Sequence, residues 1–172
     1  MRCGAIYGSR RGTAAIEFAL VAPLLLLLTA GIVEFGRIYV VYDAIDRIAS
    51  QYAIAWADCT DSPAGACQTE ISSYASTNTL TNFTPQIFSA RLTLQMFQIT
   101  MSGTTPTIVY ASPTGATLSS AQTSLAQSTF SSGQSAVIVT ATYSHSLAYF
   151  PTFMTRYLGA YLTPSFTVAQ LK

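Results

Sequence analysis

Charge is what this sequence has least of. Only 9% of its 172 residues are charged, against about 25% in typical soluble domains. No acidic residue follows Glu70, and from residue 71 onward the charged side chains are Arg91, Arg156 and Lys172. The net charge is +1 without any basic stripe, so the electrostatic footprint of a nucleic-acid-binding protein is missing. The charge-poor part is rich in Ser, Thr, Gln and Tyr instead, which indicates a β-rich exported domain.

The ingredients of a catalytic or metal site are equally scarce. His145 is the single histidine. A Ser–His–acid arrangement around it needs a carboxylate, which only a residue far away in the sequence, such as Asp58 or Asp61, could supply. No repeated metal-ligand spacing and no Gly-rich phosphate loop occurs. We therefore predict no enzyme activity, no metal, no cofactor and no small-molecule substrate, and we interpret His145 as a surface or packed residue.

What the sequence does have is a long apolar run near its start. Residues 18–33 read FALVAPLLLLLTAGIV without a charge, and residues 13–33 are interrupted only by Glu17. A helix rises about 1.5 Å per residue and needs about 20 residues to cross a hydrocarbon core of about 30 Å. Residues 13–33 are therefore predicted to be a transmembrane segment. Arg10 and Arg11 precede it, and such basic flanks favour an N-terminus in the cytoplasm.

Other interpretations of this run remain open. Thr29 and Gly31 could fill the small −3 and −1 positions of an ordinary secretory peptide, whose removal would release a soluble product. The arginine pair also occurs in twin-arginine export signals, although small residues follow it here. A buried core helix could be equally apolar. These alternatives differ in where the mature chain begins.

The segment RRGTAAIEFALVAPLLL resembles the start of the TadE-like proteins, which are prepilin-like (pseudopilin) components of tight-adherence (Flp-type) pilus systems. In signals of this kind a basic leader ends in Gly, and the mature chain carries Glu at its fifth position. Gly12 would end the leader here, Thr13 would be first and Glu17 fifth, followed by Phe18. The resemblance is strong over residues 10–50 and rests beyond them on general layout. It implies cleavage between Gly12 and Thr13 by a membrane prepilin peptidase of the bacterial inner membrane.

The chemistry of these residues fits that implication. Gly12 has no side chain, so the backbone can enter a narrow active site in extended form. Cleavage would create a charged α-amine at Thr13. An acidic side chain at mid-membrane costs roughly 2.5–3.5 kcal/mol on insertion scales, and pairing Glu17 with the α-amine of a neighbouring subunit would offset that cost. We predict that Glu17 and Phe18 act in assembly or recognition. The simpler alternative is that Glu17 lies at the membrane interface.

An amphipathic pattern follows the span. Apolar or small residues recur three or four positions apart, the spacing of one helical face, at Ile38, Val41, Ile45, Ile48, Tyr52 and Ala55. Asp43 and Arg47 lie on another face, four residues apart, and can form an exposed ion pair. No turn cluster separates this pattern from the span. We therefore predict one helix over residues 13–57, in which residues 34–57 pack on an outer domain or on other subunits.

Cys59 and Cys67 bracket a short loop after this helix. In an oxidising compartment they can close a disulfide, and two unpaired thiols are the alternative. Cys3 lies in the leader, residues 1–12, and should be removed with it. A second short helix is expected over residues 69–80.

The remaining residues predict strands. Runs rich in β-branched and aromatic residues occur at 90–101, 107–111, 136–143 and 165–171. Residues 112–135 are expected to form an exposed connection, and residues 149–161 a packed loop or short helix. The predicted fold class is α+β with a pilin-like layout: a long N-terminal helix packed against a small antiparallel sheet. Residues 58–172 would form a periplasmic or extracellular domain.

Two functions remain at this stage. The first is a minor pilin or prepilin-like assembly component, whose partners would be a prepilin peptidase, other pilus or pilus-assembly subunits and the lipid bilayer. The second is a membrane-anchored or secreted envelope binding or adhesion module without a filament role. The first predicts cleavage after Gly12, whereas the second predicts an intact N-terminus or ordinary secretory cleavage.

Overall fold

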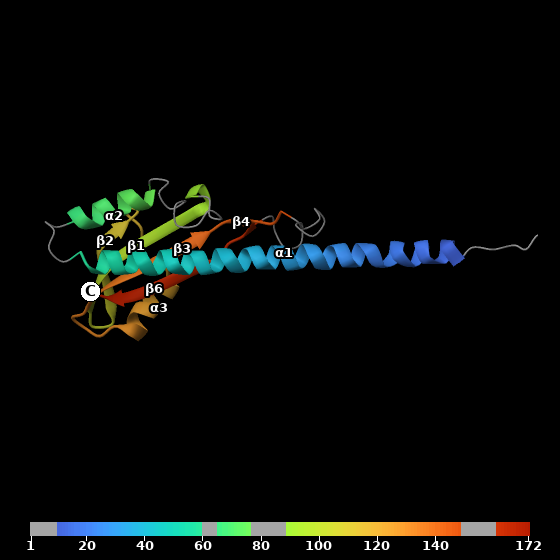
Figure 1. Cartoon of the computed structure of the whole chain (residues 1–172). Coiled ribbons are helices and arrows are strands. Elements are labelled where there is room, and N and C mark those ends of the chain that lie inside the picture. Colours follow the sequence, from blue (N-terminus) through green and yellow to red (C-terminus); the bar gives the residue numbers. More distant parts are fainter. Residues whose placement is uncertain (1–9, 60–64, 77–88, 149–160) are drawn as a thin grey trace, which may run out of the picture.

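The computed structural model describes residues 10–59, 65–76, 89–148 and 161–172. Figure 1 shows one long helix, α1 (Arg10–Ala57), whose C-terminal part lies against a small domain while its N-terminal part projects away from it. The domain contains a four-stranded sheet and short helices. The prediction of an α+β fold with a long N-terminal helix packed on a small antiparallel sheet is therefore confirmed.

The sheet is antiparallel throughout, with strand order β2-β1-β3-β6. Its strands are β1 (Leu92–Ser102), β2 (Thr105–Ser112), β3 (Ser135–Tyr143) and β6 (Ser165–Leu171). The four runs of β-branched and aromatic residues correspond to these strands, so the strand predictions are confirmed. β1 and β2 form a hairpin whose turn contains Gly103 at φ 63°, a left-handed conformation that glycine adopts without strain.

Short elements complete the described chain. α2 (Ala66–Ser76) follows α1, and the 3-10 helix η2 (Ser89–Arg91) leads into β1. β4 (His145–Ser146) pairs with β5 (Tyr161–Leu162) in a separate two-stranded sheet. A second short helix was expected over 69–80; α2 begins earlier, and residues 77–80 lie outside the described residues. The prediction for 149–161 also falls outside them, except at Tyr161 in β5.

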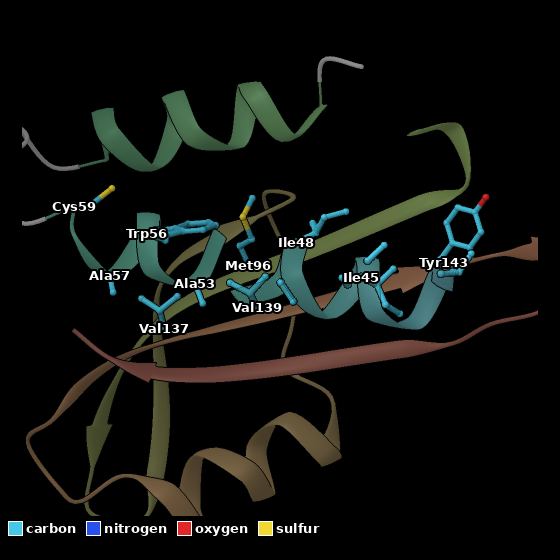
Figure 2. Packing of buried hydrophobic residues seen from close by; sticks show 14 residues of the cluster. Ile45, Ile48, Ala53, Trp56, Ala57, Cys59, Met96, Val137, Val139 and Tyr143 are labelled. Atoms are coloured by element: carbon cyan, nitrogen blue, oxygen red, sulfur yellow. The ribbon is translucent and has the colours of Figure 1, made fainter. Parts of the chain in front are cut away.

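One face of the sheet packs against α1 (Figure 2). The buried apolar residues that α1 contributes are Val41, Ala44, Ile45, Ile48, Ala49, Ala53, Trp56 and Ala57. They meet Met96 of β1 and Val137 and Val139 of β3. The predicted stripe is confirmed at its centre, but Ala55 is exposed. Because an α-helix has 3.6 residues per turn, the buried face drifts away from a strict 3-4 alternation and reaches Trp56 instead.

The opposite face of the sheet is covered by helix α3 (Ser120–Thr129). Residues 112–135 were expected to be an exposed connection; they do connect β2 to β3 and are mostly exposed, but the helix within them was not predicted. Ser119 caps the helix: its side chain accepts a hydrogen bond from the Gln122 backbone, and the Gln122 side chain accepts one from the Ser119 backbone. Ala126 is fully buried against a cluster that includes Phe97 and Ile138. Only a few apolar residues of α3 pack it against the sheet. The composition of the segment is therefore polar and resembles that of a loop.

Candidate functional site

The projecting part of α1 has an apolar surface that the domain does not cover. Its large exposed residues are Ile16, Phe18, Leu20, Val21, Leu24, Leu25, Leu26, Leu28, Ile32, Val33 and Phe35. Among the described residues, α1 is the one helix long and apolar enough to cross a membrane. Exposed apolar area of this extent needs lipid or other helices around it. This indicates single-pass anchoring by the N-terminal helix.

The predicted processing site lies in the first turns of this helix. Gly12 and Thr13 are helical, whereas the prediction placed the backbone around Gly12 in extended form at the moment of cleavage. A peptidase would therefore have to open the first turn of α1, where helix ends fray most readily. Cys3 and the rest of residues 1–9 lie outside the described residues.

Thr13 and Glu17 share one helical face, since residues four apart lie one above the other. Thr13, Glu17 and Phe18 are all exposed. Among the side chains that the structure describes, none forms a salt bridge with Glu17. Within one chain, the carboxylate is thus presented on the apolar projecting surface.

A second polar group lies where the apolar run ends. Glu34 is fully buried, and its carboxylate oxygen Oε1 lies 3.0 Å from His145 Nε2 and 3.4 Å from the backbone nitrogen of Ala148. Its other oxygen, Oε2, accepts a hydrogen bond from Arg37 Nη1 at 3.3 Å. A buried carboxylate is tolerated when such donors surround it. Glu34 therefore connects α1 to the chain segment that follows β3.

Glu34 was not predicted as a site residue, although the sequence contains a signal for it. The stripe that contains Ile38, Val41 and Ile45 extends back by one helical turn to Glu34, which therefore points to the same face as the core. A charged residue on the core-facing stripe needs a partner within the fold. His145, the single histidine, was the candidate for that partner.

His145 does not form a catalytic arrangement with its neighbours. Asp58 and Asp61 were the distant acids considered as partners for it; Asp61 lies outside the described residues, and the carboxylate that contacts His145 is that of Glu34. Ser146 Oγ accepts a hydrogen bond from Arg91 Nη1 at 2.6 Å, and within the described residues no serine hydroxyl bonds to the imidazole. No group of three metal-binding side chains is found in that part of the chain either. The geometry is that of a packed, paired histidine.

Cys59 and Cys67 are joined by a disulfide in the structure, with their Cα atoms 5.8 Å apart. The bond connects the end of α1 to α2. Next to it, Gly65 has φ 92° and a Cβ at this position would lie 2.8 Å from the Tyr110 ring. Gly65 thus packs closely on Tyr110 of β2, and a side chain at this position would clash with the ring.

The TadE-like protein family model matches residues 12–53. No curated protein and no solved structure gives a significant match. The matched segment begins at Gly12, contains Glu17, Phe18 and Glu34, and ends within the part of α1 that packs on the sheet. The resemblance predicted over residues 10–50 is therefore confirmed, and this segment of the chain is TadE-like.

Proposed function

We propose that this chain is a minor pilin or prepilin-like assembly component of a Flp-type pilus, cut after Gly12 by a prepilin peptidase and held in the membrane by α1. The TadE-like segment implies involvement in a tight-adherence pilus system. The role as a pilin or assembly component is supported by the projecting half of α1, which exposes an apolar surface and the Glu17 carboxylate. Such a surface is suited to packing against the helices of other subunits.

The proposed location is the bacterial inner membrane, with the N-terminus in the cytoplasm and the C-terminal domain in the periplasm or outside the cell. Arg10 and Arg11 before the span support this orientation. The disulfide between Cys59 and Cys67 also supports it, since such bonds persist in oxidising compartments. Both observations support an arrangement in which the two ends of the span lie on opposite sides of the membrane.

Intact-mass and N-terminal analysis of the membrane-extracted protein, produced with and without a cognate prepilin peptidase, tests the proposal. A start at Thr13 that depends on the peptidase is the expected result. A start near Ile32 would mean secretory cleavage, which removes Glu17 and excludes the pilus role. An uncleaved Met1 in a host that processes other prepilins would favour a permanently tethered envelope domain.

A Gly12→Val variant supplies a matched control, because it adds a β-branched side chain just before the proposed scissile bond. The span and the domain are unchanged in this variant. We expect it to remain in the membrane fraction with its leader attached. Processing of Gly12→Val at the wild-type rate would contradict the assignment of Gly12.

A further inference from the structure

A pocket of about 430 Å³ lies between α1 and the segments that carry Arg91 and β4. Its polar lining consists of Arg37, Arg91, His145 and Ser146, and its apolar lining includes Val33 and Val40. In Figure 1, β4 lies at the end of the domain from which the free part of α1 projects. The pocket is thus located where the helix leaves the domain.

We propose that this pocket binds the phosphate headgroup of an anionic phospholipid, in the leaflet on the domain side of the membrane. The proposal rests on the proposed function in one respect, that α1 spans a membrane. It adds a specific lipid contact that orients the domain at the membrane surface.

The depth of the pocket along the helix fits a headgroup. The uncharged run ends at Val33 and Arg37 follows four residues later, a rise of about 6 Å along a helix. Headgroup regions add roughly 5–8 Å on each side of the hydrocarbon core. With the apolar run in the core, the guanidinium of Arg37 and the pocket beside it lie at the level of the lipid phosphates.

The charge of the lining also fits. Arg37 and Arg91 line the pocket, and no acidic side chain is among its described lining residues. The Glu34 carboxylate, which contacts the lining residues Arg37 and His145, is fully buried and is also bonded to Ala148. Each guanidinium carries five N–H donors in a planar fork that matches phosphate oxygens, so it can bind a phosphate beside the neighbours it already has.

The apolar part of the lining favours a lipid over a free phosphate ion. Val33 and Val40 line the same pocket and are 48% and 43% exposed, so they suit the glycerol and the first methylenes of an acyl chain. Inorganic phosphate would leave this apolar surface against water. Val33, the last residue of the apolar run, lines the pocket, and the rest of the run extends from there into the membrane. A lipid bound in the pocket could therefore keep its acyl chains in the bilayer.

Native mass spectrometry of the full-length protein in a neutral detergent tests the proposal. The probes are dioctanoyl phosphatidylglycerol, dioctanoyl phosphatidylcholine and inorganic phosphate, each titrated separately. We expect one phosphatidylglycerol to bind in preference to phosphatidylcholine. Arg91→Gln should weaken it at least about tenfold, since hydrogen bonds to charged groups contribute about 1.5–3 kcal/mol each. Arg91→Lys should restore part of the loss, because it keeps the charge without the planar fork.

Arg47→Gln is the matched control, because Arg47 lies on the same helix with a side chain 72% exposed and outside this pocket. It should bind phosphatidylglycerol like the wild type. Arg37→Gln is a second test, read together with its thermal unfolding because Arg37 also bonds to Glu34. Equal binding by Arg91→Gln and wild type, or equal loss in Arg47→Gln, overturns the proposal.

The remaining outcomes identify the source of the phosphate and separate this proposal from the proposed function. If inorganic phosphate binds as tightly as phosphatidylglycerol, the site takes a free anion and the lipid assignment is wrong. If phosphatidylcholine binds as tightly as phosphatidylglycerol, the pocket does not recognise the negative charge of the headgroup. The same spectra give the mass of the protein, so a start at Met1, Thr13 or Ile32 is read independently of whether lipid binds.

Discussion

His145 Nε2 lies 3.0 Å from Glu34 Oε1 across a sequence separation of 111 residues. The contact is buried and joins the exit of the apolar helix to the chain that follows β3. The Asp43–Arg47 pair on the same helix is different: its N–O distance is also 3.0 Å, but both side chains are largely exposed. Exposed pairs contribute little to stability. We therefore infer that the contact between Glu34 and His145 holds the domain against this end of the helix.

Replacing either Glu34 or His145 should lower the free energy of unfolding by more than an ordinary hydrogen bond between neutral groups contributes. His145→Ala removes the imidazole from the buried Glu34 carboxylate, which keeps its bonds to Arg37 and the Ala148 backbone; a hydrogen bond to a charged group contributes about 1.5–3 kcal/mol. Glu34→Gln keeps the shape and an acceptor oxygen, so its effect should be smaller. The double variant should lose less than the sum of the two single variants, because the groups are in contact.

Unfolding of the full chain in detergent, followed by fluorescence, measures these changes. Trp56 is the single tryptophan and is 1% exposed, so it reports the opening of the helix–sheet core. Arg47→Ala is the control and should change the free energy of unfolding by no more than about 0.5 kcal/mol. Strictly additive effects of Glu34→Gln and His145→Ala would show that the two side chains do not act together.

The disulfide should stabilise the junction between α1 and α2. Cys59 and Cys67 are separated by 8 positions, and the entropy model assigns about 2–3 kcal/mol to so short a loop. We expect the Cys59→Ser/Cys67→Ser variant to lose a free energy of unfolding of this order. Alkylation of the exported wild-type protein should modify neither residue until a reductant is added. Modification of both without a reductant would contradict the bond.

The sequence predicted those parts of the fold that follow from regular patterns. The helix over residues 13–57, the strands and the TadE-like segment each carry a periodic or compositional signal that does not depend on distant residues. Helix α3 was missed because its stabilisation comes from the Ser119–Gln122 capping box and from one buried alanine, Ala126. The capping box pattern is present in the sequence, but the polar composition around it is equally typical of a loop.

The candidate sites also divide into those that rest on the local sequence and those that depend on the tertiary fold. The roles of Gly12, Thr13 and Glu17 come from the resemblance of the local sequence to TadE-like proteins, and they stay predictions. The contact between Glu34 and His145, and the pocket beside Arg91, depend on chain segments far apart in the sequence. Pairing of this kind is set by the tertiary fold. Glu34 was not predicted as a site residue and His145 was interpreted as a surface or packed residue, so their contact was not predicted.

Tyr52 should make stability depend on alkaline pH. Burial raises the pKa of its phenol above the ordinary value of 10, because a phenolate is poorly solvated there. The unfolded chain therefore loses this proton at a lower pH than the folded protein does. The contribution is fully present below about pH 10 and is lost as the pH rises through the pKa of the folded state.

Tyr52→Phe removes the titrating hydroxyl and keeps the ring in the groove formed with Ile71 and Tyr74. Unfolding measured from pH 8 to pH 11 should show a shallower decline in stability for this variant than for the wild type. Identical pH profiles for the two proteins would mean that the Tyr52 phenol titrates alike in the folded and unfolded chains.

Glu17→Gln should separate membrane insertion from assembly. The side chain is exposed on the projecting part of α1, beside the exposed Phe18, and glutamine keeps its size while removing its charge. Insertion should be unchanged or improved, because a neutral side chain is easier to place in the membrane. If Glu17 pairs with the α-amine of a neighbouring subunit, losing the charge leaves that amine without its partner in a desolvated contact. Co-purification with other pilus subunits should then fall at least about tenfold, a loss equivalent to about 1.4 kcal/mol.

Two control variants make this measurement specific to the charge at position 17. Glu17→Asp keeps the carboxylate and should retain part of the assembly, while Glu70→Gln removes an exposed carboxylate of α2 and should leave it intact. Membrane fractionation and the N-terminal sequence of each variant establish that the protein is inserted and processed. Normal assembly of an inserted, processed Glu17→Gln protein would contradict the pairing. Glu17 would then be better explained as an interfacial residue, held near the headgroups by its own hydration.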